Sequence, residues 1–262
     1  MIYRMLHCEF IKIRRNPILL VGFFAVLISV GYSVFQMYLG YNAGEEMSFE
    51  ILNYVLVFNN TTLVFPATFT LFGGYLINRE YEADTMKSLL TVPISLRKIF
   101  IIKILITGIF SVFFGLISFI LVMLSGQFLL HFDITLEQTV FSIKQVCGMA
   151  LFNYIAVSPI IILSTRKRGY YMVGAGISFL LGLISLFVGK SSLTNFFPIT
   201  AGYKLVDYAA AYETANPLVS IAVYLVIILI LAICIYYLPP YDDLMIVSKK
   251  KGYKKESINF FK

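Results

Sequence analysis

The residues of this chain that could carry a specific chemistry lie between Asn78 and Lys98, where the sequence reads NREYEADTMKSLLTVPISLRK. This charged island lies between two apolar runs, each long enough to cross a membrane. Asp84 or Thr85 can cap a short helix, because their side-chain oxygens accept hydrogen bonds from the first free backbone N–H groups. The pattern predicts a helix that ends at Pro93 and docks on another protein, with the apolar face Met86, Leu89 and Leu90. The alternative interpretation is an ordinary solvated loop, which would also contain capping residues and basic residues.

The rest of the chain offers little for catalysis. Its apolar runs hold almost no ionisable residues away from their ends, whereas membrane enzymes keep such groups inside their spans. His7 and His131 are too far apart for a metal-binding pair on one helix turn. The sequence GKS at 189–191 resembles the end of a phosphate-binding loop, but Ile184 stands where the motif requires glycine. We expect a non-catalytic chain that holds no metal and no cofactor.

The composition indicates that lipid surrounds most of the chain. Of its 262 residues, 59% are hydrophobic and 13% charged, and the mean hydropathy is +0.85. Soluble domains average about 25% charged residues. Six apolar runs meet the length of about 20 residues that a membrane-spanning helix needs. They cover residues 17–39, 53–77, 99–125, 145–164, 170–189 and 217–238. We predict an all-α membrane protein in which residues 1–262 form one domain of six transmembrane helices.

Basic residues predict the orientation of these helices. If the N-terminus is cytoplasmic and each run crosses once, eighteen Lys and Arg residues fall inside and three, Lys144, Lys190 and Lys204, fall outside. Such a bias follows the positive-inside rule, so both termini are expected in the cytoplasm. Anionic lipids then account for the net charge of +7, and no nucleic acid is expected as a partner.

Residues 1–15 are expected to form an amphipathic helix at the membrane interface. At about 100° per residue, its apolar face collects Ile2, Met5, Leu6, Phe10 and Ile13, and its basic residues are Arg4, Lys12, Arg14 and Arg15. Glu9 falls within the apolar arc, where a carboxylate is costly unless it is paired. It can pair with Lys12, or it can contact the charged island or a partner. Lys103, one turn inside the third run, is expected to extend its amine to the inner face.

Two further segments differ from plain loops. Residues 190–216 are too short to cross and return as full helices, yet they are rich in aromatic and aliphatic side chains. We expect short re-entrant or interfacial helices there, on the outer side before the last span. Residues 239–262 form a Lys-rich tail that is expected on the inner leaflet.

Small residues recur at helical spacing in several runs, most clearly at Gly174, Ser178 and Gly182 in the fifth. In lipid, small residues let helix backbones approach closely. This stripe predicts helix packing within the chain, and a subunit interface is the alternative. Runs two and five show no clear duplicated break, and we expect no buried acid that could carry a proton or a sodium ion. The energy for any transport is therefore expected to come from another subunit.

The charged island resembles the signature of ABC-2 type permeases, in which Glu-x-Gly-Thr-Leu is followed by Leu-Leu, Pro-Ile/Val-Ser, basic residues and a Lys. The similar positions are Glu82, Thr85, Met86, Leu89, Leu90, Pro93, Ile94, Ser95, Arg97 and Lys103. Asp84 stands where the family often has Gly, so the turn into the helix is expected to be capped rather than bent at a glycine. The basic start from Glu9 to Arg15 and the outer segment 190–216 also resemble this family.

The resemblance implies a permease that pairs with a second copy or a paralogue and with two ATP-binding subunits, in which ATP and magnesium bind. The charged island would lie in a groove of the ATPase, with the contact residues Glu80, Glu82, Asp84, Thr85, Met86, Leu89, Leu90, Pro93 and Arg97. The chain further resembles the small six-span permeases of bacitracin or lantibiotic self-protection exporters of low-GC bacteria. That likeness implies the bacterial cell membrane and an amphiphilic substrate such as an antimicrobial peptide or a drug.

The segments expected outside hold seven acidic residues against three lysines, and Glu45, Glu46 and Glu50 form the densest group. An acidic face attracts cationic peptides within a Debye length of about 8 Å. Exclusion of lysine from outer loops would produce the same balance. The alternative function is a membrane scaffold or assembly subunit that binds a soluble partner through residues 78–98 without transport, and an intramembrane enzyme is more distant.

Overall fold

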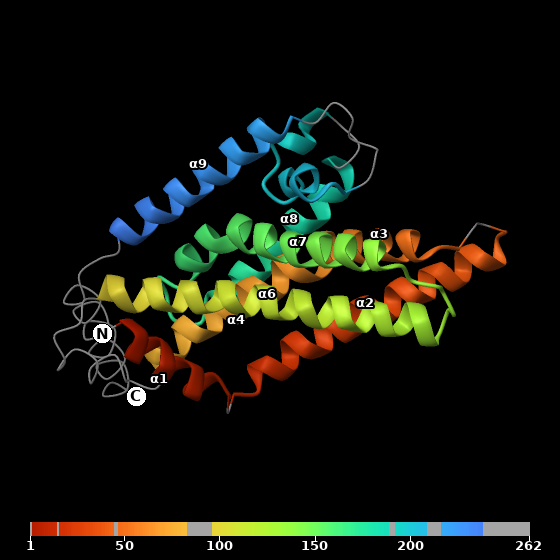
Figure 1. Ribbon diagram of the computed structural model, residues 1–262. Coiled ribbons are helices and arrows are strands. Elements are labelled where there is room, and N and C mark those ends of the chain that lie inside the picture. Colours follow the sequence, from red (N-terminus) through yellow and green to blue (C-terminus); the bar gives the residue numbers. More distant parts are fainter. Residues whose placement is uncertain are drawn as a thin grey trace, which may run out of the picture.

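The computed structural model describes residues 2–14, 16–44, 47–82, 96–188, 192–208 and 216–237. All regular structure in these ranges is helical, as expected where lipid leaves each backbone polar group to bond within its own segment. The α-helices are α1 (Ile2–Arg14), α2 (Ile18–Asn42), α3 (Phe49–Asn59), α4 (Phe65–Glu82), α6 (Leu96–Phe128), α7 (Leu136–Ser164), α8 (Tyr171–Val188) and α9 (Pro217–Tyr236) (Figure 1). A π-helix, η1 (Asn60–Val64), joins α3 to α4, and two 3₁₀-helices, η2 (Ser192–Asn195) and η3 (Ala201–Val206), follow α8.

Six helical stretches are long and apolar enough to cross a membrane, which confirms the predicted architecture. They cover Ile18–Asn42, Phe49–Glu80, Arg97–Phe128, Leu136–Ser164, Tyr171–Val188 and Pro217–Tyr236. The second stretch continues past residue 77, where the apolar run ends, so the first part of the charged island is helical.

The fourth stretch begins nine residues before the predicted start, because a capping box fixes its N-terminus. Thr135 Oγ1 accepts from the backbone N–H of Gln138 at 3.3 Å, and Gln138 Oε1 accepts from the backbone N–H of Thr135 at 3.0 Å. The polar residues Glu137, Gln138, Ser142 and Lys144 interrupt the apolar sequence ahead of residue 145. Of these, Ser142 faces the bundle interior, as does Gln145 at the start of the predicted run.

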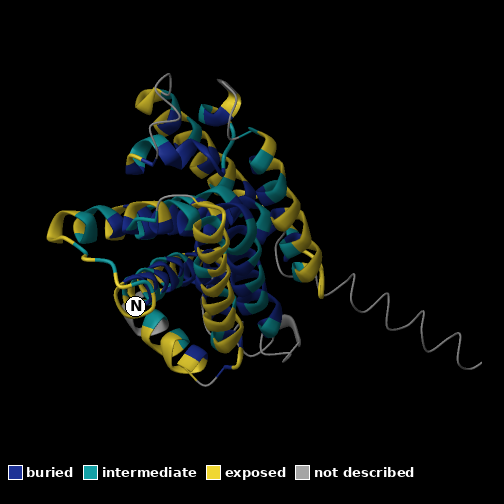
Figure 2. Cartoon of the chain, turned by 90° about the vertical axis from the view of Figure 1, so that its right-hand side faces the viewer, coloured by how far each residue is buried: buried dark blue, intermediate teal, exposed yellow. Residues whose placement is uncertain are grey.

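The second span lies at the centre of the bundle. Its second half, α4, packs against α8, α7 and α6. The second span is the most buried of the six, whereas α8 and α9 are the least buried. In Figure 2, buried residues line the faces that the helices turn toward one another, and exposed residues line the outward faces. The surface of the second span is therefore contacted mainly by neighbouring helices rather than by lipid.

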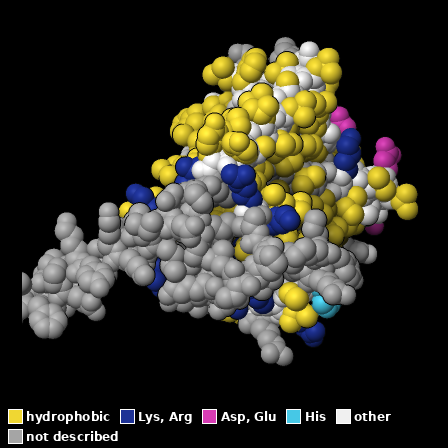
Figure 3. All heavy atoms as spheres, turned by 90° about the vertical axis from the view of Figure 1, so that its left-hand side faces the viewer, with side chains coloured by type: hydrophobic (Ala, Val, Ile, Leu, Met, Phe, Trp, Pro, Cys, Tyr) yellow, Lys and Arg dark blue, Asp and Glu magenta, His cyan; other side chains and the backbone are white. Residues whose placement is uncertain are grey.

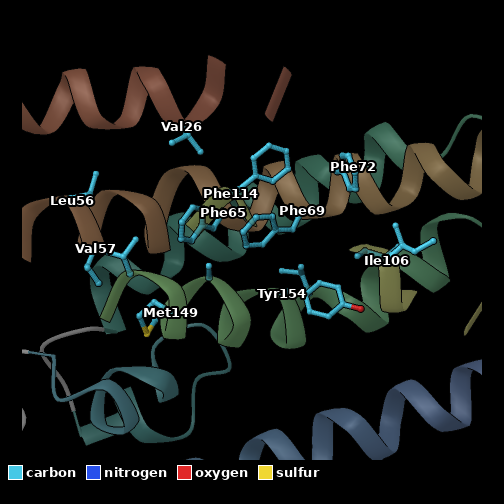
Figure 4. Close-up of a cluster of buried hydrophobic side chains, with 14 of the residues drawn as sticks. Val26, Leu56, Val57, Phe65, Phe69, Phe72, Ile106, Phe114, Met149 and Tyr154 are labelled. Carbon is cyan, nitrogen blue, oxygen red and sulfur yellow. The ribbon is translucent and has the colours of Figure 1, made fainter. Parts of the chain in front are cut away.

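Aromatic rings fill the contact between α2, α4, α6 and α7. Figure 4 shows Phe65, Phe69 and Phe114 between Val26 of α2 and Tyr154 of α7. The rings of Phe65 and Phe69 stack with centroids 4.9 Å apart. Gly22 of α2 makes room for Phe114, since a Cβ there would lie 2.3 Å from the Phe114 ring. Lipid is as apolar as these side chains, so close packing rather than escape from water stabilises the contact.

The predicted N-terminal helix is present as α1, which lies against α6 and α2. Ile13 is buried, and the ring of Phe10 lies 5.7 Å from that of Phe110 in α6. The position of α1 at a membrane interface stays a prediction.

The described part of the outer segment 190–216 contains η2 and η3, which pack on each other and on α9. Its re-entry into a bilayer stays a prediction. The tail 239–262 lies outside the described residues.

Candidate functional site

Four charged side chains from three helices form one cluster, which we call the charged cluster: Glu9 and Lys12 of α1, Glu80 of α4 and Lys103 of α6. Lys12 Nζ lies 2.8 Å from Glu9 Oε1 and 3.3 Å from Glu80 Oε1. Lys103 Nζ lies 3.1 Å from Glu9 Oε2 and 3.1 Å from Glu80 Oε1. Each lysine therefore bridges both carboxylates.

Local structure brings these groups to one place. Glu9 and Lys12 are three residues apart in α1, so they lie on the same helix face. Glu80 lies near the end of α4, and Lys103 lies in the second turn of α6. Because α4 leads into residues 83–95 and α6 leads out of them, the cluster joins the two helices that flank residues 83–95.

Burial makes the cluster strong and sensitive to any change in charge. The side chains of Lys103 and Glu80 are 3% and 6% exposed, and that of Glu9 is 14% exposed. Two cations and two carboxylates balance, which permits their burial, because an unpaired buried charge costs several kcal/mol (about 3–5 when one partner is removed). The prediction that Lys103 extends to the inner face is wrong, since α1 covers its position and offers it Glu9.

Lys12 forms the exposed edge of the cluster. Burial is the largest single influence and lowers the pKa of Lys12, but the hydrogen bonds and charges of Glu9 and Glu80 together outweigh it. The pKa of Lys12 is therefore raised, and its amine stays protonated at neutral pH. Arg79 Nη1 also donates to the Lys12 carbonyl at 3.5 Å, which adds a second link between α4 and α1.

The other predicted contact residues of the island are placed only in part. Glu82 is the last residue of α4, and Arg97 in α6 lies with its guanidinium 5.0 Å from the ring centre of Tyr236 in α9. Asp84, Thr85, Met86, Leu89, Leu90 and Pro93 lie outside the described residues, as do Arg15, Glu45 and Glu46. Arg14 is exposed at the end of α1, and Glu50 is exposed in α3, where Oε1 accepts from Gln138 Nε2 at 3.4 Å.

Basic side chains lie at the end of the bundle that contains the charged cluster (Figure 3). Seen from the end of the bundle where α1 and the start of α6 lie, the described surface displays Lys and Arg side chains (Figure 3). The exposed ones include Arg97 and Lys98 at the start of α6 and the turn 166–168 between α7 and α8. Asn78 Oδ1 anchors that turn by accepting from the backbone N–H of Gly169 at 2.7 Å.

The small-residue stripe of α8 is buried inside the chain. A Cβ on Gly174 would lie 2.5 Å from Ser164 Cβ, and one on Gly182 would lie 2.2 Å from the Thr62 carbonyl oxygen. Between them, Ser178 Oγ accepts from Thr70 Oγ1 at 2.7 Å. These residues bring α8 against η1, α4 and the end of α7, and this stripe is not exposed for a subunit interface.

Sequence reasoning missed a set of buried polar side chains in the second span. Asn60 Oδ1 accepts from Ser29 Oγ at 2.6 Å, and Asn60 Nδ2 donates to Ser118 Oγ at 2.8 Å. Asn59 Nδ2 donates to Ser33 Oγ at 2.9 Å and to Gln36 Oε1 at 2.7 Å. These bonds link the second span to α2 and α6. The signal was visible as the polar run NNTT at 59–62 inside an apolar stretch.

The first half of the same span is linked to α7 and, through it, to the segment 190–216. Asn53 Nδ2 donates to Gln145 Oε1 at 2.7 Å, and Asn53 Oδ1 accepts from Ser142 Oγ at 2.6 Å. Gln145 Nε2 in turn donates to the Asp207 carbonyl at 2.9 Å, and Lys144 forms an exposed ion pair with Asp207. Polar contacts thus extend from the middle of the bundle to the end opposite the charged cluster.

Within the described residues, no group of three or more His, Cys, Asp or Glu side chains lies close enough together to hold a metal ion. Ionic contacts hold α1, α4 and α6 together beside residues 83–95.

Comparison with known proteins adds one finding. Residues 5–185 match the family model described as ABC-2 family transporter protein. No curated protein and no solved structure shows a significant match to this chain.

Proposed function

This chain belongs to the ABC-2 family of transporter proteins and is a membrane permease component of an ABC transporter; we propose that a separate ATPase subunit drives it through residues 78–98. In this proposal, two ATP-binding subunits hold ATP and magnesium, and a second permease, identical or paralogous, completes the membrane part. Residues 78–98 lie in a groove of the ATPase on the cytoplasmic side, where both termini of this chain also lie.

The observation that carries the proposal is the charged cluster. A segment that is displaced by the ATPase moves the membrane spans only if both of its ends are rigidly attached to them. Glu80 precedes residues 83–95 and Lys103 follows them, and their side chains are joined at 3.1 Å in a buried setting. Glu9 and Lys12 extend this link to α1. Movement of residues 83–95 would therefore displace α4, α6 and α1 together.

The exposed Lys and Arg residues at the same end of the bundle support a cytoplasmic position for the charged cluster. Cytoplasmic loops carry an excess of Lys and Arg. The turn 166–168 and the first turn of α6 place exposed basic residues at this end of the bundle. Anionic lipids of the inner leaflet attract such residues.

Coupling is tested with two substitutions in the island and one matched control. Glu82→Lys and Leu89→Asp are each expected to abolish stimulation of the partner ATPase, while the amount of chain in the membrane stays unchanged. Glu137→Lys reverses a charge on an exposed residue at the opposite end of the bundle and is expected to leave stimulation intact. Wild-type stimulation by both island variants would refute the docking role.

Co-purification decides between a transporter and the alternative of a scaffold. In mild detergent, an ATPase with bound nucleotide is expected to accompany this chain. A soluble partner without ATPase activity would favour the scaffold instead.

For the substrate we propose an amphiphilic cationic compound such as an antimicrobial peptide, which the transporter expels from the bacterial cell membrane. The acidic balance of the outer segments supports this class, because it concentrates cations at the outer face. Joint replacement of Glu45, Glu46 and Glu50 by Gln is expected to reduce protection against a cationic peptide, most strongly at low salt. Replacing Asp242 and Asp243 by Asn removes acids from the tail expected inside and serves as the control. Equal protection in all three strains would exclude this role of the outer acids.

A further inference from the structure

The second span contains a break that its sequence explains. The backbone N–H of Phe65 bonds to the Asn60 carbonyl, five residues earlier, in the π-helix η1. Pro66 follows directly, and a proline ring clashes with the carbonyl four residues before it, which here belongs to Thr62. In membrane helices, a local π-turn is one way to accommodate proline. The extra residue of the π-turn therefore moves the Thr62 carbonyl away from the Pro66 ring.

The displaced carbonyl needs space, and α8 provides it at Gly182. A Cβ at this position would lie 2.2 Å from the Thr62 oxygen and 3.4 Å from Pro66 Cγ, so no residue larger than glycine fits without a shift. Another glycine of α8, Gly176, faces open space. Gly182 thus leaves the space that the π-turn occupies. A substitution of Gly176 provides a matched control.

One side-chain contact at the π-turn is longer than those that Asn59 and Asn60 make. Asn153 of α7 is fully buried, and its Nδ2 reaches Thr61 Oγ1 only at 3.5 Å. Its Oδ1 accepts no hydrogen bond from any described residue. A buried amide oxygen without a donor costs about 1–3 kcal/mol, so Asn153 would gain from a donor that reaches its Oδ1.

A π-turn can move along a helix, because its extra residue can be taken up by the next turn. Moving it past one residue turns that residue by about 100° around the helix axis. The polar side chains of Asn59, Asn60 and Thr61 lie in or beside the turn, so such a shift would exchange their partners on α2, α6 and α7. The inner half of the span, beyond the turn, ends at the charged cluster, and the outer half carries Asn53.

We infer that the π-turn at residues 60–64 is a hinge of the second span, seated against Gly182, through which movement at the charged cluster reaches the outer half. Gly182 is a positioning residue in this mechanism. The inference rests on the proposed coupling to an ATPase, which supplies the movement.

The test removes the hinge and keeps both halves of the span in register. Deletion of Leu63 takes out the one extra residue and allows a continuous α-helix. Spin labels at position 50 in the outer half and at position 218 in α9, both exposed, report the distance between these elements by pulsed electron paramagnetic resonance. The background carries Ser in place of the three cysteines, Cys8, Cys147 and Cys234. The complex with its ATPase is measured with and without a non-hydrolysable ATP analogue.

In the wild-type complex the analogue is expected to shift this distance. With Leu63 deleted, the ATPase should still bind and the shift should be lost. Gly182→Ala should also remove the shift, whereas Gly176→Ala should keep it, and this pair decides the question where the deletion variant does not fold. An undiminished shift in the deletion variant or in Gly182→Ala overturns the hinge, as does a wild-type complex with bound ATPase and no shift. Failure of the wild-type chain to bind an ATPase refutes the proposed function itself.

Discussion

Replacement of Lys103 by Met provides the sharpest test of the charged cluster. Met has a similar length and keeps the apolar stem, but it removes one of two cations from a balanced group. Glu9 and Glu80 would then share Lys12 as their single cation. The cluster would carry a net negative charge in a place where Glu80 is only 6% exposed.

The expected loss follows from the distances. At an effective dielectric constant of about 20, each contact at 3.1 Å contributes about 5 kcal/mol of attraction, which desolvation of the two ions largely offsets. Removing one partner leaves the desolvation without its compensation, so Lys103→Met should destabilise the protein by about 3–5 kcal/mol. Adding Glu80→Gln restores the charge balance, and the double variant should be more stable than Lys103→Met alone.

A thiol-reactive dye provides the assay, because the chain contains no Trp. Cys234 is buried and Cys147 is half-buried, so both react as the bundle unfolds. Exposed Cys8 is replaced by Ser in every variant to lower the background. The measured quantity is the midpoint temperature of dye labelling in detergent.

Lys144→Met is the matched control. It also removes a lysine from an ion pair, but Lys144 and Asp207 are 51% and 60% exposed, and such pairs contribute about 0–1 kcal/mol. If Lys103→Met lowers the midpoint no more than Lys144→Met does, the charged cluster is not a buried ionic link. A double variant that is less stable than Lys103→Met would contradict the charge-balance argument.

Two further substitutions test polar contacts by the same assay. Asn60→Ala should cost about 1–3 kcal/mol, because it leaves the buried hydroxyls of Ser29 and Ser118 without their amide partner; an unchanged midpoint would show that these hydroxyls find other partners. Asn78→Ala should cost a similar amount, since the backbone N–H of Gly169 loses its acceptor, and it should speed proteolysis within residues 166–168; equal cleavage rates in both proteins would argue against an anchored turn.

The fold class could be predicted from the sequence because lipid imposes a simple length rule. A span needs about 20 apolar residues, and all backbone groups must bond within it, so six apolar runs give six helices. Helix ends were predicted less well, since α7 begins ahead of its apolar run with polar residues such as Gln138 and Ser142, of which Ser142 faces the interior. The resemblance of residues 78–98 to a permease signature is likewise a property of the sequence, and the family match agrees with it.

The direction in which a polar side chain points was decided by tertiary structure. Lys103 was recognisable as a lysine one turn inside its span, but its partners Glu9 and Glu80 are 94 and 23 residues away in sequence. Whether such a lysine extends to the membrane surface or turns inward depends on which helices cover its face of α6. Pro66 likewise indicates a distortion of the second span. The Thr62 carbonyl, however, has space only because Gly182 of another helix lies against this carbonyl. An apolar run can be recognised from residues that are neighbours in the sequence. Charge pairing and close backbone approach depend on residues that only folding brings together.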